Sequence, residues 1–269
     1  NLNNKNMAVI GCGNVGSAVC KKSKALGVNI LKNDPPLQGK FPNQNYLPLK
    51  EILPVSDIVT VHVPFVKNGK WPTNYLVNKD FLKLMKPGSI FINSSRGQIC
   101  DENALISILE EKRLLSTVLD VWSGEPDLNT DLYDHVSIAT PHIAGHSFNA
   151  KLKGTLDCYN SLCDFFSVKN KLESFKELKT STKNIQINAN DYASDQLILN
   201  KIVKMNYDIL LDHEIFKKNI LEKNSISEAF TFFRKNYTNR LEFSNSKVKI
   251  QNTANDLIQK VEQLGFKTI

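Results

Sequence analysis

The chain has 269 residues, of which 41% are hydrophobic, so it is long enough for two soluble globular domains of ordinary size. The apolar runs have the length of strands and no charged and then apolar leader is present, so we expect neither a membrane segment nor an export signal. The net charge is +7, but the lysines are scattered among asparagines and isoleucines, which argues against a nucleic-acid partner.

Cysteines and histidines give no sign of a metal site. The five cysteines are odd in number and lack a C-x-x-C pair, which disfavours a disulfide framework or zinc and favours a reducing cytoplasm. His142 and His146 stand four apart, yet Pro141 and Gly145 make that segment a loop without a third ligand. We therefore expect no bound metal.

The first elements in chain order, from Met7 to Asp34, read as a strand, a glycine turn, a helix and a second strand that ends in an acid. In G-x-G-x-x-G spacing, the first glycine permits the bend, the second admits a pyrophosphate to bare backbone, and the third allows the helix to pack on the strand. An acid at the end of the second strand can accept hydrogen bonds from ribose hydroxyls and would repel a 2′-phosphate, so we expect NAD rather than NADP. The predicted dinucleotide contacts here are Gly11, Gly13, Asn14, Val15, Gly16 and Asp34.

The following elements alternate strand and helix, as in a doubly wound parallel sheet of the Rossmann type. Together with a smaller C-terminal α/β domain, they define an α/β protein. The sequence predicts strands at 56–63, 89–93, 116–121 and 136–139, and helices at 78–85 and 102–112.

A long helix is predicted from residue 147 to about residue 168, followed by a polar linker around 169–183. Its apolar residues fall on one helical face, which we expect to be core. The predicted division is a nucleotide-binding domain at 1–146, a connecting helix and linker at 147–175, and a C-terminal domain at 176–269. The expected core face comprises Leu152, Leu156, Tyr159, Leu162, Cys163 and Phe166.

In the tail, a further helical face is predicted from apolar residues at helical spacing. Arg234, Lys235 and Arg240 lie near it, and we favour a solvated basic helix over a contact with a substrate phosphate. The apolar positions are Ala229, Phe232, Phe233, Tyr237 and Leu241.

Arg96, Glu125 and His142 each follow a predicted strand, and a doubly wound sheet collects its functional groups at strand carboxyl ends. Arg96 can hold a substrate carboxylate with two hydrogen bonds and polarise a developing carbonyl. His142 can take a hydroxyl proton while hydride leaves the same carbon, and Glu125 can fix its tautomer and raise its pKa.

Each of these residues has an ordinary alternative, as a surface charge, a turn residue or a loop histidine, and their joint placement favours function. His62 lies near the end of an apolar strand. This position fits a histidine that lines the cofactor cleft and a histidine that is simply packed there equally well. Cys12 and Cys100 are better explained as small apolar fillers than as nucleophiles.

These segments resemble the D-isomer-specific 2-hydroxyacid dehydrogenases. The resemblance is carried, in order along the chain, by GCGNVGSAV, NDPP, MKPGSIFINSSRGQICDENAL, VLDVWSGEP and ATPHIAGHSFNAK. The resemblance narrows to the branch of the family that acts on a phosphorylated four-carbon acid. This rests mostly on the tail segment AFTFFRKNYTNRLEF, and also on NVGSAV followed by DPP, on LDVWSGEP and on IAGHSFNAKLKGT.

The resemblance implies that Arg96, Glu125 and His142 are catalytic, and that Asp34, Val63, Asp120 and Gly145 stand at NAD contacts. Arg96 and His146 fall on substrate-binding positions. Val63 replaces a usual threonine and His146 a usual tyrosine. The lost hydroxyl contact costs on the order of 1 kcal/mol.

The implied reaction is NAD-dependent oxidation of 4-phospho-D-erythronate to (R)-3-hydroxy-2-oxo-4-phosphobutanoate, on the route to pyridoxal 5′-phosphate, in a cytosolic homodimer paired through the C-terminal domain. Relatives carry a further lobe ahead of the glycine turn, which closes over the substrate. Two alternatives stay open at this point: another D-2-hydroxyacid dehydrogenase, or a truncated NAD-binding protein without activity.

Overall fold

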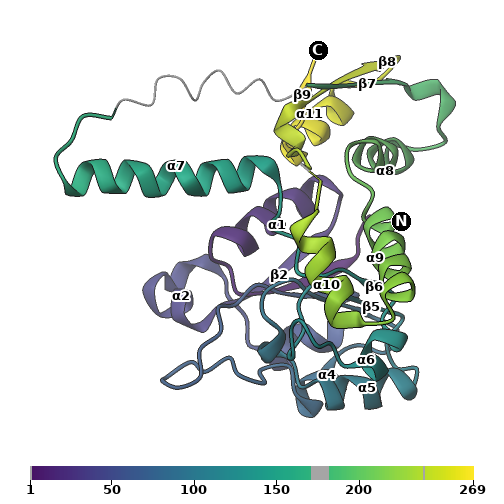
Figure 1. Ribbon diagram of the computed structural model, residues 1–269. Helices are drawn as coiled ribbons and strands as arrows, with labels where there is room; N and C mark the ends of the chain where they lie inside the picture. Colours follow the sequence, from purple (N-terminus) through teal and green to yellow (C-terminus); the bar gives the residue numbers. More distant parts are fainter. Residues whose placement is uncertain (1, 171–181, 239) are drawn as a thin grey trace. The chain divides into compact units, whose positions relative to one another are not determined.

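The computed structural model describes residues 2–170, 182–238 and 240–269, which form two compact units (Figure 1). The first unit holds a six-stranded parallel sheet in the order β2-β1-β3-β4-β5-β6. The chain leaves β1 toward β2 and then returns to β3 on the other side, so the strand order reverses next to β1, where such sheets bind ligands. The strands are β1 (Asn6–Ile10), β2 (Asn29–Asn33), β3 (Ile58–Val61), β4 (Ile90–Asn93), β5 (Ser116–Leu119) and β6 (Ile138–Ala139).

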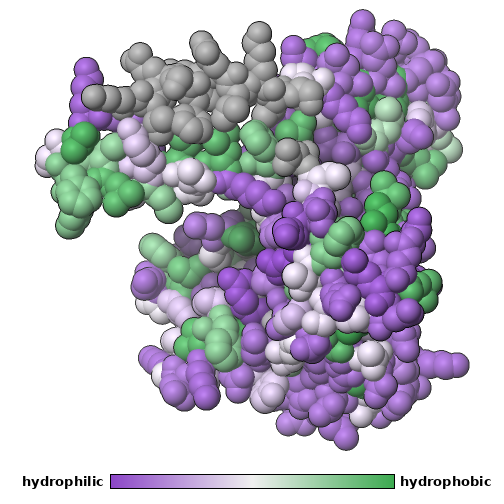
Figure 2. All heavy atoms as spheres, in the orientation of Figure 1, coloured by the Kyte–Doolittle hydropathy of each residue, from purple (hydrophilic) through white to green (hydrophobic). Residues whose placement is uncertain are grey.

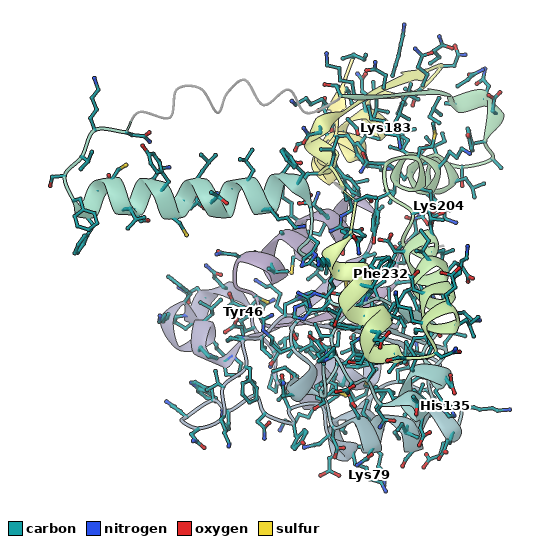
Figure 3. All side chains as sticks on the ribbon, in the orientation of Figure 1. Tyr46, Lys79, His135, Lys183, Lys204 and Phe232 are labelled. Atoms are coloured by element: carbon teal, nitrogen blue, oxygen red, sulfur yellow. The ribbon has the colours of Figure 1, made fainter. Side chains whose placement is uncertain are left out.

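The central strands are buried because their sequences are nearly continuous apolar runs, which suits a parallel sheet covered on both faces. Val9, Val59 and Val61 are fully buried. One apolar cluster joins Met7 and Val9 to Cys12, Cys20 and Tyr46, the last labelled in Figure 3. This confirms the predicted doubly wound α/β class.

The helices of the first unit agree with the predicted alternation, and several begin at a capping side chain. Asp34, Asn78, Asp101 and Asn129 each accept from an amide in the first turn of the helix that follows. The α-helices are α1 (Asn14–Ala25), α2 (Pro35–Lys40), α3 (Leu49–Ile52), α4 (Lys79–Leu84), α5 (Glu102–Glu110) and α6 (Thr130–His135), with 3-10 turns η1 (Pro42–Gln44), η2 (Leu53–Val55) and η3 (Gly97–Ile99).

The first unit also contains α9 (Ile209–Lys223) and α10 (Ile226–Lys235), which follow much later in the chain. Phe216 of α9 packs edge-on against Tyr133, and its neighbours in α10 are buried with it. The amide of Ala139 in β6 donates to Nδ1 of His213 at 3.1 Å. This division differs from the consecutive one predicted at residues 146 and 175, because these contacts attach residues 209–236 to the sheet.

The second unit, residues 144–208 and 237–269, holds a three-stranded parallel sheet in the order β7-β8-β9. Its strands are β7 (Lys183–Asn188), β8 (Ser246–Gln251) and β9 (Lys267–Thr268), and its helices are α7 (Phe148–Phe165), α8 (Asp195–Asn206) and α11 (Asn255–Leu264), with 3-10 turns η5 (Ala189–Asp191) and η6 (Phe243–Asn245). None of the described helices of either unit has the length and apolar character needed to cross a bilayer.

The prediction that one face of α7 is buried in the core of this chain is wrong. No described residue of α7 is buried, and Leu162 and Phe166 are 57% and 65% exposed. Figure 2 shows apolar side chains at the far end of this helix. Helical periodicity identifies a face that avoids water, but it does not say that the same chain covers it. Most of the predicted linker lies outside the described residues.

The tail helix is shorter than its predicted apolar face. α10 ends at Lys235, so Tyr237 and Leu241 lie beyond it, while Phe232 is 45% exposed. The buried face of α10 consists of Ala229, Phe230 and Phe233. The prediction did not include Phe230, which is 4% exposed.

Candidate active site

The glycine turn between β1 and α1 has the geometry of an anion cradle. Gly11 has a φ of 86°, which disfavours any residue with a Cβ, and a Cβ on Gly16 would lie 1.9 Å from the carbonyl oxygen of Gly11. A Cβ on Gly13 would meet no atom within 4 Å, so this glycine faces open space. The turn therefore has room for a pyrophosphate at the one glycine where close approach is required.

Helix α1 starts at this turn with Asn14, and its N-cap residue Gly13 provides no side-chain cap. The first amides of the helix are thus directed at the turn without a capping oxygen, as in sites that bind phosphate. Val15 is 61% exposed beside them. Asn14 and Val15 lie where the sequence predicted cofactor contacts.

Asp34 connects the end of β2 to the glycine turn. Its Oδ2 accepts from the amide of Cys12 at 2.8 Å, and its Oδ1 accepts from the amide of Leu37 at 2.9 Å. The residue thus caps α2 and holds the turn. Each carboxylate oxygen has a second lone pair, so these bonds leave acceptor capacity for a ribose hydroxyl.

The end of β3 packs directly on the glycine turn. A Cβ on Gly11 would lie 2.8 Å from the backbone carbonyl of His62 and from Cγ1 of Val63. His62 Nε2 lies 3.0 Å from Oγ1 of Thr60, and burial lowers the pKa of His62 to about 4. His62 is therefore a neutral, half-buried residue at the edge of the cofactor turn, and Val63 stands beside it.

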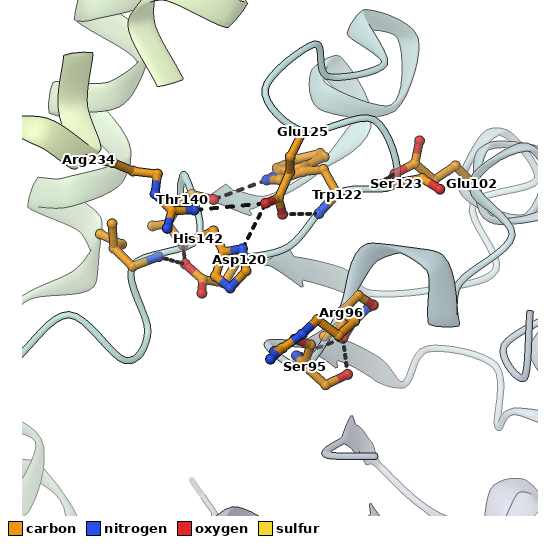
Figure 4. Close-up of polar contacts among 12 residues, drawn as sticks. Ser95, Arg96, Glu102, Asp120, Trp122, Ser123, Glu125, Thr140, His142 and Arg234 are labelled. Carbon is orange, nitrogen blue, oxygen red and sulfur yellow. Dashed lines mark hydrogen bonds and ion pairs between the residues drawn. The ribbon is translucent and has the colours of Figure 1, made fainter. Parts of the chain in front are cut away.

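Glu125 and His142 form the candidate reactive pair of the site (Figure 4). Nδ1 of His142 lies 2.7 Å from Oε2 of Glu125, and Oε1 of Glu125 accepts from the amide of Trp122 at 2.9 Å. The carboxylate can only accept, so Nδ1 carries a hydrogen, and in the neutral ring Nε2 is then the nitrogen with the lone pair. The imidazole is thus oriented as a base with its second nitrogen directed away from Glu125.

The backbone at His142 is in the left-handed region, with a φ of 54°. Its amide donates to the carbonyl of Asp120 at 2.6 Å. The buried Oδ1 of Asp120 accepts from Thr140 Oγ1 at 2.6 Å and from the amide of Ile143 at 2.8 Å. Asp120 therefore fixes the loop that carries His142 from both sides of the histidine.

Arg96 follows β4 and is exposed. Its carbonyl accepts from Nδ2 of Asn93 at 3.1 Å, and its Nη1 donates to the carbonyl of Ser95. A Cβ on the adjacent Gly97 would lie 2.0 Å from the backbone of Trp122. The segment after β4 is therefore pressed against the segment that leads to Glu125, which brings two of the three predicted residues to neighbouring strand ends.

Two supporting residues, Trp122 and Glu102, were missed by the sequence reasoning, and a third, Arg234, was assigned to a solvated helix. Trp122 Nε1 donates to the carbonyl of Thr140 at 3.1 Å, which ties the Glu125 loop to the His142 loop. Oε1 of Glu102 accepts from the amide of Ser123 at 2.7 Å, and burial raises the pKa of Glu102. Arg234 Nη1 lies 3.9 Å from Oε2 of Glu125. The expectation of a solvated residue is wrong for Arg234, because α10 belongs to the first unit and its arginine is only partly exposed beside Glu125.

Gly145 and His146 belong to the second unit, where the ring of His146 lies 6.2 Å from that of Tyr237. Their roles toward cofactor and substrate stay predictions. Cys12 and Cys100 are buried. A hydrogen bond with Cys20 and burial raise the pKa of Cys12, and burial raises that of Cys100, so neither is a nucleophile at neutral pH.

Comparison with known families identifies the class of protein to which this fold and site belong. Residues 1–144 match the D-isomer specific 2-hydroxyacid dehydrogenase family, NAD binding domain. The chain belongs to this family, and NAD is its cofactor, as the glycine turn and Asp34 predicted. Residues 179–265 match a domain of unknown function.

Relatives of the chain carry the name of one particular enzyme of this family. The chain is 38% identical to the erythronate-4-phosphate dehydrogenase of Wigglesworthia glossinidia brevipalpis, over 98% of this chain and 68% of the relative. It is 34% identical to that of Shewanella sp. (strain DB6705), over 100% of this chain and 99% of the relative.

Solved structures agree on the fold. The NAD-dependent formate dehydrogenase of Staphylococcus aureus in complex with NAD has a TM-score of 0.53 at 26% identity, over 61% of this chain and 49% of that one. The D-lactate dehydrogenase of Aquifex aeolicus with NAD and lactic acid has the same TM-score and identity, over 61% and 54%. The aligned part spans about half the length of these two enzymes.

Proposed function

We propose that the protein oxidises 4-phospho-D-erythronate to (R)-3-hydroxy-2-oxo-4-phosphobutanoate with NAD, in the synthesis of pyridoxal 5′-phosphate. The observation that carries the proposal is the 2.7 Å contact between Glu125 and His142 at the carboxyl end of the sheet. The substrate rests on relatives named erythronate-4-phosphate dehydrogenase that align over almost the whole chain, including the tail.

In this proposal the chemistry is divided among three side chains. Nε2 of His142 takes the proton of the substrate hydroxyl, and Glu125 stabilises the imidazolium that results. Arg96 holds the substrate carboxylate in a bidentate hydrogen bond, for which its exposed guanidinium is suited. NAD, when bound, accepts the hydride.

The cofactor would be held by the glycine turn, with its pyrophosphate at Gly13 and the N-terminus of α1. Asp34 would accept from the ribose. Asp120, Val63 and Gly145 are the further proposed contacts to NAD, and His146 is a proposed contact to substrate. The fit is supported by the open space at Gly13, which other glycines of the turn lack.

We also infer a homodimer in the cytoplasm, paired through the second unit. The inference of a dimer is supported by the exposed apolar residues at the end of α7: Leu162, Phe165, Phe166 and Val168. All five cysteines have free thiols, which suits a reducing compartment.

The test is a turnover assay on the purified chain with NAD and 4-phosphoerythronate, followed by NADH absorbance. A keto-acid acceptor is supplied in parallel, so that tightly held NADH is recycled. D-lactate and D-glycerate serve as comparison substrates. Preference for 4-phosphoerythronate is expected. A preference for D-glycerate would assign another dehydrogenase, and NAD binding without turnover of any substrate would contradict the proposal.

A further inference from the structure

Arg234 reaches the reactive pair from a distant part of the chain. Its Nη1 lies 3.9 Å from Oε2 of Glu125, which is the same oxygen that lies 2.7 Å from Nδ1 of His142 (Figure 4). The other oxygen of Glu125 is bonded to the amide of Trp122. The carboxylate is therefore approached by an amide, an imidazole and a guanidinium, and it stands between Arg234 and His142.

The guanidinium is placed by the packing of its helix. Its Cζ lies 5.5 Å from the centroid of the Phe230 ring, one turn earlier in α10. Phe230 and Phe233 are buried and pack edge-on against Phe216 of α9. A helix anchored by these rings gives the arginine side chain a fixed base, and the ion pair does not depend on a mobile loop.

Other negative charges lie near Glu125 and His142, and the positive charge of Arg234 opposes their effect on the imidazole. Two other carboxylates lie near this pair. Glu102 accepts from the amide of Ser123, and Asp120 accepts from the amide of Ile143, next to His142. Negative charge on this side favours a protonated imidazole, which cannot accept the proton of a substrate hydroxyl. A positive charge on the far side of Glu125 opposes that effect.

We propose that Arg234 is a positioning residue for the Glu125–His142 pair, which restrains the Glu125 carboxylate and offsets part of its negative charge. This inference deepens the proposed function and rests on it. Arg234 acts through Glu125, and no contact of Arg234 with substrate is required.

The first experiment follows the titration of the His142 ring by nitrogen-15 NMR, with His142→Asn to assign the signal. In Arg234→Gln the midpoint should rise by about 0.3 to 0.7 pH units, the size expected for a half-exposed ion pair. Arg234→Lys keeps the charge and should restore most of the shift. Lys235→Gln, an exposed neighbour on the same helix, removes an equal charge and should leave the midpoint unchanged.

The second experiment measures the pH profile of kcat with 4-phosphoerythronate. The acid limb should move to higher pH in Arg234→Gln by about the same 0.3 to 0.7 pH units, so that kcat falls about two- to fivefold at pH values below the midpoint, with NAD affinity unchanged. Equal titration midpoints in Arg234→Gln and Lys235→Gln would overturn the proposal. The NMR titration needs no turnover, so it tests Arg234 even if the substrate assignment fails, and circular dichroism shows that each variant is folded.

Discussion

The amide of His142 donates to the carbonyl of Asp120 at 2.6 Å, and the carboxylate of the same aspartate accepts from the next amide, that of Ile143. His142 is held between them at a φ of 54°. A non-glycine residue in this region costs on the order of 1 kcal/mol or more, which the surrounding bonds must offset. The direction of the imidazole is therefore fixed by the backbone of its loop as well as by Glu125.

His142→Ala removes the proposed base without disturbing the glycine turn. We expect kcat to fall by about 10² to 10⁴, the usual contribution of a general base, with NAD affinity within about twofold of wild type. Turnover and NAD titration measure the two quantities. His135→Ala, at an exposed histidine of α6, is the control and should change neither. Parallel loss of turnover and NAD binding would indicate a structural role instead.

Gly13→Ala and Gly16→Ala separate cofactor binding from folding. The new Cβ at residue 13 meets no protein atom, so stability should be nearly unchanged while NAD affinity falls through a clash with the pyrophosphate. At residue 16 the Cβ would lie 1.9 Å from the Gly11 carbonyl, which should cost about 1–3 kcal/mol of stability as well. Urea denaturation and NAD titration of both variants provide the comparison. A stable Gly13→Ala protein with normal NAD affinity would argue against this turn as the pyrophosphate site.

Asp34→Ala should relax the choice of cofactor. Without the carboxylate, NADP is no longer repelled, so the ratio of NADP to NAD affinity should rise at least about tenfold, equivalent to about 1.4 kcal/mol. The variant also loses the N-cap of α2, at about 0.5–2 kcal/mol. Asn78→Ala removes the cap of α4 and is the matched control. An unchanged cofactor ratio in Asp34→Ala would place the ribose elsewhere.

His62 makes the fold sensitive to acid. Its pKa is lowered by burial to about 4, whereas an unfolded histidine titrates near its ordinary value of 6.5. Between these two pH values His62 is protonated in the unfolded chain but not in the folded protein. The free energy of unfolding therefore falls as the pH drops from 6.5 to 4, by roughly 3 kcal/mol over the whole range. His62→Gln should lose less stability than wild type between pH 7 and pH 4.5, as measured by urea denaturation. Parallel losses in the two proteins would show that His62 does not contribute.

The apolar end of α7 tests the proposed dimer. Phe165 is 80% exposed, so a charged residue there should not harm the folded chain but should disfavour burial against a second copy. Sedimentation should show a dimer for wild type and a larger monomer fraction for Phe165→Asp. Leu115→Asp, at a 72% exposed leucine of the first unit, should remain dimeric. A wild-type chain that sediments as a monomer would contradict the dimer.

The local parts of this site could be predicted from the sequence, because they follow from backbone rules. Glycine spacing after an apolar strand predicts the cradle, and strand ends of a doubly wound sheet collect Arg96, Glu125 and His142. Asp34 was likewise found from its place at the end of a strand. Its second role as the cap of α2 was not part of that prediction, although the following prolines are typical of a helix start.

The long-range parts could not be predicted. Arg234 looks like any basic residue near the end of a helix, and only the packing of α10 within the first unit brings it to Glu125. Glu102 resembles an ordinary acid in a first helical turn. For α7, periodicity indicated an apolar face but not what covers it. For Arg234 and Glu102 the deciding contact lies many residues away, where a single sequence has no periodic signal.

The discontinuity of the first unit also has a consequence for synthesis. A ribosome adds about 5–20 residues per second, so the strands up to β6 leave it several seconds before α9 and α10 do. Until then the buried side of Tyr133 lacks Phe216, and Glu125 lacks Arg234. The nascent first unit therefore stays incomplete while the intervening residues 144–208 are made, and Arg234 can reach Glu125 only after α10 has been made.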